Sequence, residues 1–312
     1  MPLRIDWDGC CRSEWDRLAA AAPACPFEQS WLYGDAFAPR DADSVRRGVA
    51  FGGDAPLAIV QALARRFGSL VTLVQILRGP VLLMPDQPPE TVTALYRRIR
   101  AEIRRDPREI LFWSPELPAG DDGLAIMRAC RMRRILTGYA SARIDLTQDA
   151  AALRAALHGK WRNALSRAET GPLRVDPDTD RAALSWLLER YGALRRQRSF
   201  GGPGPEMLAH ALSGAAPDDS LTLRAFSGGE AVAGALFMRH GREASYLIGW
   251  AGDEGRRLNA GALLIWRAML ELRRLGVGSL DLGGIDTRRS PGIARFKLGT
   301  GGEPYTLAGT FA

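Results

Sequence analysis

The chain has 312 residues, of which 46% are hydrophobic and 25% charged, so it is long enough for two globular domains with buried cores. It lacks the roughly 18 consecutive apolar residues of a membrane helix, a signal-peptide pattern and any metal-ligand spacing among its four cysteines and three histidines. We therefore expect a cytoplasmic protein with no metal and no integral membrane segment. The net charge of +7 favours polyanionic partners such as tRNA, a nucleotide-linked substrate, coenzyme A or an anionic membrane surface.

The first half of the chain alternates helix-like and strand-like segments. Residues 88–105 have helical periodicity, because Val92, Leu95 and Ile99 recur at three- and four-residue steps. The other predicted helices begin at 13, 31 and 123, and the predicted strands cover 55–63, 70–77 and 109–113.

The pattern restarts near residue 143. Helices are predicted over 149–168, 181–198 and 260–275, and strands over 221–226, 231–238, 244–250, 279–282 and 305–311. Tight turns at Gly228-Gly229 and Gly241 are expected to join the first three of these strands.

Two strands of the second half are expected to lie side by side. Residues 244–250 and 279–282 are joined through a helix, and strands joined in this way pair in parallel. Ligands of α/β sheets usually bind near the carboxyl ends of such strands. Gly249, Gly283 and Gly284 stand at these ends and permit a close approach of the backbone to a ligand.

Only two of the 42 basic residues are lysines, Lys160 and Lys297. Arginine carries a permanently charged planar fork, whereas lysine carries a compact ammonium that can approach a single oxygen. The two exceptions are therefore candidate functional residues. The arginines form short clusters such as Arg97-Arg98-Ile-Arg100 and Arg131-Met-Arg-Arg134, which we interpret mostly as solvated helix faces.

Several short motifs follow one another in a fixed order along nearly the whole chain. They are Pro26-Phe27 with Ser30-Trp31, Arg78-Gly79-Pro80, Lys160-Trp-Arg-Asn163 with Arg167-Ala168, Arg195 to Phe200, Tyr246-Leu-Ile-Gly-Trp250, Asp281-Leu-Gly-Gly284, and Gly292-Ile-Ala-Arg-Phe-Lys297 with Gly301-Gly302. In this order the motifs resemble those of the Fem-type non-ribosomal peptidyl and aminoacyltransferases, a branch of the acetyltransferase (GNAT) fold.

The resemblance implies an α/β (α+β) architecture of two tandem GNAT-like domains, each a mixed, mostly antiparallel sheet flanked by helices. We place the domains at residues 1–142 and 143–312 and expect the better-formed active site in the second. The span from 181 to 210 leaves no room for the long helical arm that some tRNA-using members carry.

The function implied by the resemblance is transfer of an aminoacyl group from aminoacyl-tRNA to an amine. The acceptor would be a small molecule or resemble a peptidoglycan precursor. No tightly bound cofactor and no DNA partner are expected, while a peripheral membrane contact remains open.

Two alternatives remain at this point. An acyl-coenzyme A-dependent N-acetyltransferase would bind pyrophosphate through a loop that includes Arg256, Arg257, Asn259 and Gly261, although Ala260 stands where a glycine is expected. The same loop is equally well explained as a helix start with Asn259 as its N-cap. A non-catalytic GNAT-fold protein that binds an anionic ligand is the second alternative.

Amide formation needs positive charge where the tetrahedral oxyanion develops. The resemblance assigns this role to Lys297; the alternative is a surface lysine near a helix start, which would be poorly placed against the helix dipole. Asp281 is the second candidate catalytic residue, since it could accept a proton from the amine through water or orient the amine. A salt bridge to an arginine would equally explain a carboxylate inside this apolar strand.

The remaining candidates are substrate-binding residues, each with a structural alternative. Arg198 ends a predicted helix, where it would also favour the dipole, and Tyr246 either binds substrate or belongs to the core. Strand alternation places Leu247 and Gly249 on the face opposite Tyr246. The others are Trp250, which also suits packing, Asp286, and Lys160 with Arg162, which also suit a solvated helix face.

Overall fold

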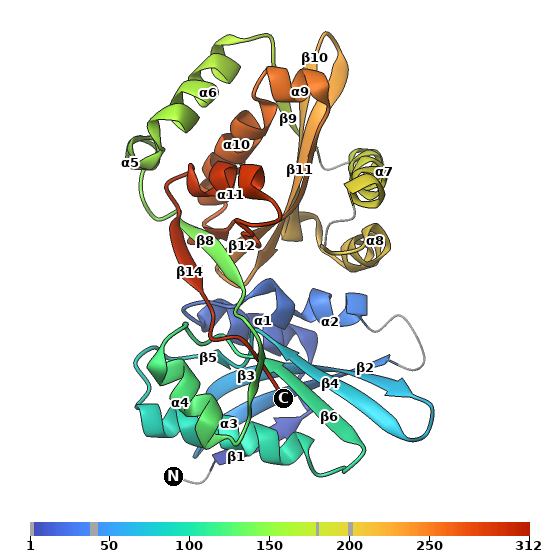
Figure 1. Ribbon diagram of the computed structural model, residues 1–312, viewed down its shortest axis with the longest axis vertical. Coiled ribbons are helices and arrows are strands. Elements are labelled where there is room, and N and C mark those ends of the chain that lie inside the picture. Colours follow the sequence, from blue (N-terminus) through green and yellow to red (C-terminus); the bar gives the residue numbers. More distant parts are fainter. Residues whose placement is uncertain (1–2, 38–42, 179–180, 199–201) are drawn as a thin grey trace. The chain divides into compact units, whose positions relative to one another are not determined.

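The computed structural model describes residues 3–37, 43–178, 181–198 and 202–312, and it divides into two compact units (Figure 1). The first unit comprises Met1–Ala140, His240–Arg242 and Tyr305–Ala312, and the second comprises Ser141–Arg239 and Glu243–Pro304. The predicted boundary at 142/143 did not anticipate the last eight residues in the first unit. They lie there because the final strand pairs with the first sheet.

The first unit is built on a mixed sheet with the strand order β1-β2-β3-β4-β6-β15-β7, and β5 pairs with β3. Its strands are β1 (Leu3–Trp7), β2 (Asp43–Gly52), β3 (Ala55–Phe67), β4 (Val71–Leu77), β5 (Val81–Leu82), β6 (Glu109–Ser114), β7 (Arg134–Leu136) and β15 (Thr310–Phe311). Its helices are α1 (Arg12–Ala21), the 3-10 turn η1 (Phe27–Gln29), α2 (Trp31–Phe37), α3 (Pro89–Ile103) and α4 (Asp121–Ala129).

Each face of the first sheet has its own apolar core. Helices α3 and α4 cover one face, where Leu95, Ile99 and Met127 pack against alternate residues of β3. Helix α1 covers the other face, where Trp15 packs with Ile59. The helical periodicity of α3 therefore supplies one of the two cores, as expected for an amphipathic helix.

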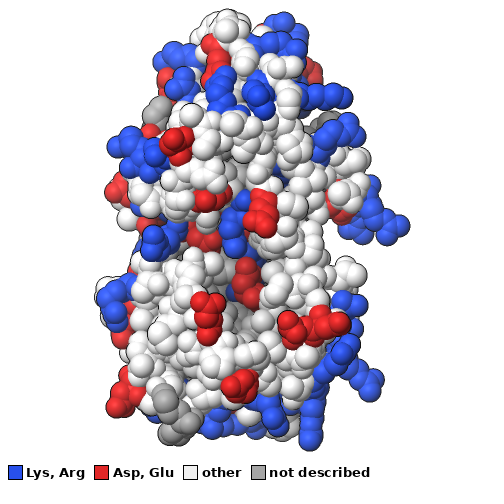
Figure 2. All heavy atoms as spheres, turned by 90° about the vertical axis from the view of Figure 1, so that its left-hand side faces the viewer, with Lys and Arg blue, Asp and Glu red and all other residues white. Residues whose placement is uncertain are grey.

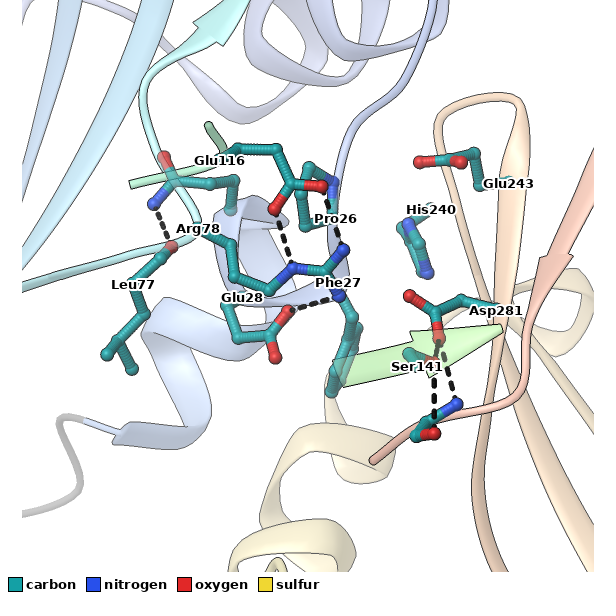
Figure 3. A network of polar contacts seen from close by, with 12 residues as sticks. Pro26, Phe27, Glu28, Leu77, Arg78, Glu116, Ser141, His240, Glu243 and Asp281 are labelled. Atoms are coloured by element: carbon teal, nitrogen blue, oxygen red, sulfur yellow. Dashed lines mark hydrogen bonds and ion pairs between the residues drawn. The ribbon is translucent and has the colours of Figure 1, made fainter. Parts of the chain in front are cut away.

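The Arg78-Gly79-Pro80 stretch lies inside the first unit and holds a buried ion pair. The Arg78 side chain donates hydrogen bonds of 2.8 and 2.9 Å to the carboxylate of Glu116 (Figure 3). Arg78 is only 5% exposed, so this pairing satisfies a charge that would otherwise be costly to bury. The motif therefore has a structural role in this unit.

The second unit has a seven-stranded sheet with the order β14-β8-β13-β12-β11-β10-β9. Its strands are β8 (Ala140–Asp145), β9 (Arg174–Asp178), β10 (Ser220–Ser227), β11 (Glu230–His240), β12 (Glu243–Ala251), β13 (Ser279–Asp281) and β14 (Glu303–Thr306). Its helices are α5 (Ala150–Ala156), α6 (Gly159–Thr170), α7 (Arg181–Arg198), α8 (Pro205–Ser213), the turn η2 (Pro217–Asp219), α9 (Asp253–Arg257), α10 (Ala260–Arg274) and α11 (Pro291–Leu298).

Helices cover both faces of the second sheet as well. Leu153, Leu165 and Leu264, from α5, α6 and α10, pack against one face. Leu187 and Leu208, from α7 and α8, pack against the other. The turn predicted between β10 and β11 is present, with positive φ angles of 58° at Gly228 and 90° at Gly229 that glycine adopts readily.

Several predicted boundaries were wrong. The helix predicted over 149–168 is two helices, because Leu157 and His158 are extended and the His158 amide donates to the carbonyl of Gly299. The strand predicted over 305–311 is divided between β14 and β15, with Gly309 at a φ of 133° between them. Long-range contacts thus override the local pattern at both places.

Both units repeat one arrangement, in which three neighbouring strands are followed by a helix and a parallel strand. In the first unit β4 pairs with β6 over six residue pairs, from Thr72↔Glu109 to Leu77↔Ser114. In the second unit the predicted parallel pairing of β12 with β13 is confirmed, but it covers only three pairs and ends at Ser245↔Asp281. The regular pairing in the second unit therefore stops while β12 continues to Ala251, whereas the pairing of β4 with β6 reaches the ends of both strands.

Across the described residues, none of the helices is long and apolar enough to cross a lipid bilayer. The same residues contain no group of three or more histidine, cysteine or acidic side chains that could hold a metal ion.

Candidate active site

The end of the parallel ladder coincides with an irregularity in β12. Leu247 and Ile248 are adjacent in sequence, yet both pack into the cluster under α7 and α8, whereas Tyr246 packs on the opposite face. This break in alternation turns Gly249 toward the Tyr246 side, where a Cβ on Gly249 would overlap the Tyr246 hydroxyl. The prediction that Gly249 faces away from Tyr246 was therefore wrong, because Leu247 and Ile248 share one face and shift the alternation by one residue.

Lys297 lies close to Gly283, just beyond the end of the β12–β13 pairing. It is only 9% exposed, and its Nζ donates a 2.9 Å hydrogen bond to the carbonyl oxygen of Gly284. The Nζ also lies 5.7 Å from the centre of the Tyr246 ring. We call Lys297, Tyr246, Gly249, Gly283 and Gly284 the Lys297 site.

The structural alternative for Lys297, a surface position near a helix start, is wrong. Helix α11 ends at Leu298, so Lys297 stands in its last turn, where a cation is favoured by the dipole. Burial lowers the pKa of Lys297 to about 8, while the negative charge of Asp281 opposes this shift. The ammonium is therefore largely protonated at neutral pH but poorly hydrated, and an approaching oxyanion would be an effective partner.

Tyr246 supplies an apolar wall beside this ammonium. Its ring lies 5.3 Å from that of Phe237, and burial, with a smaller contribution from Tyr191, raises the pKa of Tyr246 to about 12. The hydroxyl therefore stays protonated at physiological pH and can donate a hydrogen bond. The Lys297 site thus combines one cation and one neutral donor.

Asp281 stabilises the turn that contains Gly284, whose carbonyl oxygen accepts the hydrogen bond from Lys297. Its Oδ1 accepts hydrogen bonds from the Gly283 amide at 2.8 Å and from the Ser141 hydroxyl at 2.5 Å (Figure 3). Gly283 has a φ of 73°, a conformation that suits glycine. Because Asp281 is 4% exposed and contacts Gly283, it fixes the backbone that leads to the Gly284 carbonyl.

The first turn of α10 lies next to α11, the helix that carries Lys297. The Phe296 ring packs against Gly261: its Cζ lies 3.6 Å from the position that a Cβ on Gly261 would take. The centre of the same ring lies 6.0 Å from that of Trp161. The indole Nε1 of Trp161 is buried and has no hydrogen-bond partner in the described part of the chain. Gly261, in the first turn of α10, therefore lies close to the residue that precedes Lys297.

The candidate cofactor loop differs from the predicted phosphate loop. Residues 253–257 form helix α9, in which Arg256 pairs with Asp253 at 2.6 Å and Arg257 pairs with Glu254 at 2.6 Å. Asn259 takes a left-handed conformation with a φ of 59°, and its side chain makes no capping hydrogen bond. The two arginines thus already have acidic partners on their own helix.

Other candidate substrate-binding residues lie apart from the Lys297 site. Lys160 is exposed in the first turn of α6, and Arg162 donates a 2.9 Å hydrogen bond to the Leu157 carbonyl, near the end of α5. Trp250 packs edge-on against Trp186, on the sheet face opposite Tyr246.

Asp286 and Arg198, the last two predicted substrate-binding residues, lie in the turn before α11 and at the end of α7. Asp286 is exposed and accepts the amides of Arg288 and Arg289, of which the second contributes most to lowering the pKa of Asp286. This arrangement holds the turn before α11. Arg198 is the last residue of α7, and its side chain lies outside the described residues.

Two structural features of this region were not predicted from the sequence. Ser141 precedes Asp281 by 140 residues, and no local pattern signals their hydrogen bond. Helix α11 was not predicted, although Pro291 at its first position is a recognisable start signal.

Surface charge gives less guidance. On the face drawn in Figure 2, basic side chains form several groups with acidic side chains between them. On this face, the distribution of charge does not single out a binding surface for a polyanion.

Comparison with known proteins identifies the architecture. A family model described as "Acetyltransferase (GNAT) domain" matches residues 151–306, half of the chain. The structure of FemX matches with a TM-score of 0.83 at 15% identity, covering 98% of this chain and 96% of that one. No curated protein sequence matches the chain.

Two further structures match over nearly their full length. A tandem GNAT protein from the clavulanic acid biosynthesis pathway has a TM-score of 0.57 at 15% identity, with 99% and 98% of the two chains covered. The C-terminal domain of a putative lysylphosphatidylglycerol synthetase from Agrobacterium fabrum has a TM-score of 0.54 at 15% identity, with 96% and 92% covered. The predicted Fem-like, tandem GNAT architecture is confirmed.

Proposed function

This chain belongs to the acetyltransferase (GNAT) domain family and is an acyltransferase, and from that premise we propose that it transfers an aminoacyl group from aminoacyl-tRNA to an amine. The acceptor is a small molecule or a peptidoglycan-precursor-like compound. The proposal rests on the Lys297 site, and the high fold similarity to FemX supports the Fem-like version of the reaction. The neighbour named for lysylphosphatidylglycerol synthesis, whose product carries a lysyl group, adds support for an aminoacyl donor.

The observation that carries the proposal is a buried ammonium beside the end of the parallel pairing of β12 with β13. The β12–β13 ladder stops at Ser245 and Asp281, and Lys297 places its Nζ 2.9 Å from Gly284 just beyond that point. A protein needs a specific reason to bury a lysine without direct carboxylate contact, because desolvation of the charge is costly. Stabilisation of negative charge that develops only during the reaction is such a reason.

The proposed reaction follows from this arrangement. The unprotonated acceptor nitrogen attacks the ester carbonyl of the aminoacyl group and forms a C–N bond. The carbonyl oxygen becomes an oxyanion that the Lys297 ammonium stabilises, with the Tyr246 hydroxyl as a further donor. The ester C–O bond then breaks, and the ribose hydroxyl leaves with the proton that the nitrogen releases.

The acyl-coenzyme A alternative has one specific observation in its favour. The first turn of α10 places Gly261 near Phe296 and offers the backbone amides of Ala260 and Gly261, as a phosphate-binding helix start would. Against it, Arg256 and Arg257 are paired with acidic residues in α9. We therefore rank the aminoacyl donor first.

A donor assay separates the proposals. Purified protein is incubated with amine acceptor pools and either labelled aminoacyl-tRNA or labelled acetyl-coenzyme A, with Lys297→Met as the matched control. We expect label from aminoacyl-tRNA to enter an amide product only with the wild-type protein. Label from acetyl-coenzyme A alone would establish the alternative, and consumption of neither donor despite ligand binding would favour a non-catalytic protein.

A further inference from the structure

A small cavity in the first unit is lined by arginines. It lies between α3 and the end of α4, has a volume of about 210 Å³, and is bordered by Arg97, Arg100, Ala129, Cys130 and Arg131. We call it the Arg100 pocket. It belongs entirely to the first unit, whereas the Lys297 site belongs to the second.

The arginines of this pocket have no counter-charge in the described chain. Neither a hydrogen bond nor an ion pair from Arg97, Arg100 or Arg131 is found among the described side chains, and the Nε of Arg100 is buried without an acceptor. Arg98 and Arg105 differ, because both pair with Glu102, at 2.6 and 2.7 Å. The three arginines that line the cavity thus lack the acidic partner that Glu102 provides for Arg98 and Arg105.

The positive charges that line the Arg100 pocket repel one another. Burial, followed by the nearby charge of Arg104 and a smaller contribution from Arg131, lowers the pKa of the Arg100 guanidinium. Like charges held together at a partly buried position are destabilising unless something neutralises them. The floor of the pocket offers no such group, since Cys130 is 2% exposed and burial raises the pKa of its thiol to about 11, which keeps it neutral.

The end of helix α4 does not explain the arginines either. Its last carbonyls already have backbone partners, because Ile126, Met127 and Arg128 accept the amides of Cys130, Met132 and Arg131. Arg131 has a left-handed φ of 55°, and its amide makes one of these bonds at the helix end. The helix end thus needs no guanidinium for its hydrogen bonds.

We propose that the Arg100 pocket binds a phosphate group. Three guanidinium forks supply several N–H donors and enough charge for a dianion with multiple acceptor oxygens, which is more than a single carboxylate requires. The cavity is smaller than the usual range for drug-sized ligands, so it admits the phosphate while any attached group remains outside. The phosphate is either free or carried by a nucleotide, and the two sources share this recognition chemistry.

The test measures binding of named anions to the whole protein. Thermal unfolding and titration calorimetry are performed with inorganic phosphate, pyrophosphate and adenosine 5′-monophosphate, with sodium chloride at equal ionic strength as reference. We expect phosphate near its saturating concentration to raise Tm by roughly 2–4 °C beyond the chloride reference. A response to the free anions alone assigns a free phosphate, and a stronger response to the nucleotide assigns a nucleotide-borne one.

Matched substitutions on α3 test whether phosphate binds at the Arg100 pocket. Arg100→Gln should weaken phosphate binding at least about tenfold, the loss expected when one charged hydrogen-bond donor is removed. Arg97→Gln, at an exposed position, should weaken binding as well and provides a second variant if Arg100→Gln does not fold. Arg98→Gln makes the same change in net charge but leaves the pocket intact, so its affinity should match the wild type.

Two results would overturn the proposal. One is a wild-type protein that responds to phosphate no more than to chloride. The other is an equal loss of phosphate binding in Arg98→Gln and Arg100→Gln, which would indicate a general effect of net charge.

Discussion

The Nζ of Lys297 and the carbonyl oxygen of Gly284 are joined by a 2.9 Å hydrogen bond just beyond the point where the pairing of β12 with β13 ends. Gly284 follows Gly283, whose amide is held by Asp281. The position of the Lys297 ammonium is therefore fixed by three elements: the end of β13, the turn at Gly283 and Gly284, and the last turn of α11. Its position makes Lys297 the residue on which the proposed chemistry depends.

The rate of acyl transfer should depend on pH through Lys297. Since burial lowers the pKa of Lys297 to about 8, the cation is present below that pH and is lost as pH rises through it. With saturating donor and acceptor, kcat should therefore fall above pH 8. A pH profile of Lys297→Met should lack this descending limb. The same limb in both proteins would assign it to another group.

Replacement of Lys297 should not destabilise the protein near pH 7. The folded-state pKa of Lys297 is lower than its ordinary value, so the unfolded chain binds more protons between about pH 8 and 10.5 and stability rises with pH there. Lys297→Met removes the cost of burying the charge, so its Tm at pH 7 should equal or exceed that of the wild type. The advantage should shrink by pH 10, as thermal unfolding across this range can establish. A lower Tm for the variant at pH 7 would show that the ammonium stabilises the fold.

Asp281 is expected to act as a positioning residue. Asp281→Asn keeps an oxygen that can accept the Gly283 amide and the Ser141 hydroxyl, so most of the maximal rate should survive, whereas Asp281→Ala should lose it. The Asn variant also removes the charge that supports the Lys297 cation, so the descending limb should move to lower pH. Full pH–rate profiles of both variants test this. An Asn variant as inactive as the Ala variant would instead identify Asp281 as a base.

Gly249 should tolerate no side chain while Tyr246 is in place. Gly249→Ala puts a methyl group onto the Tyr246 hydroxyl, and such overpacking costs about 1–3 kcal/mol. Tyr246→Phe removes the overlapping oxygen, so the double variant should recover part of that stability in a denaturant titration. Additive losses in the double variant would place the strain elsewhere.

Local pattern was sufficient for much of the architecture. The turn at Gly228-Gly229, the helix over α3 and the parallel pairing of β12 with β13 all follow from periodicity and chain connectivity. These features depend on residues close in sequence or on the rule that neighbouring strands joined through a helix pair in parallel.

The details of the site depended on contacts that no local pattern encodes. The break in alternation at Leu247 and Ile248 appears only when the two faces of the sheet are packed. The link between Ser141 and Asp281 spans 140 residues. Arg97 and Arg98 are adjacent in sequence and both exposed, yet only Arg98 pairs with Glu102. Lys297 was singled out by composition, but its place at the end of α11 was not foreseen.

Turnover of two Lys297 variants tests the central claim most directly. If the Lys297 ammonium stabilises the oxyanion, Lys297→Met should lower kcat by roughly 100- to 1000-fold. Lys297→Arg should also be slow, because the broader guanidinium cannot place its charge at the same point. An Arg variant with near-normal kcat would show that position 297 needs only a generic cation, and a Met variant with near-normal kcat would contradict the assignment itself.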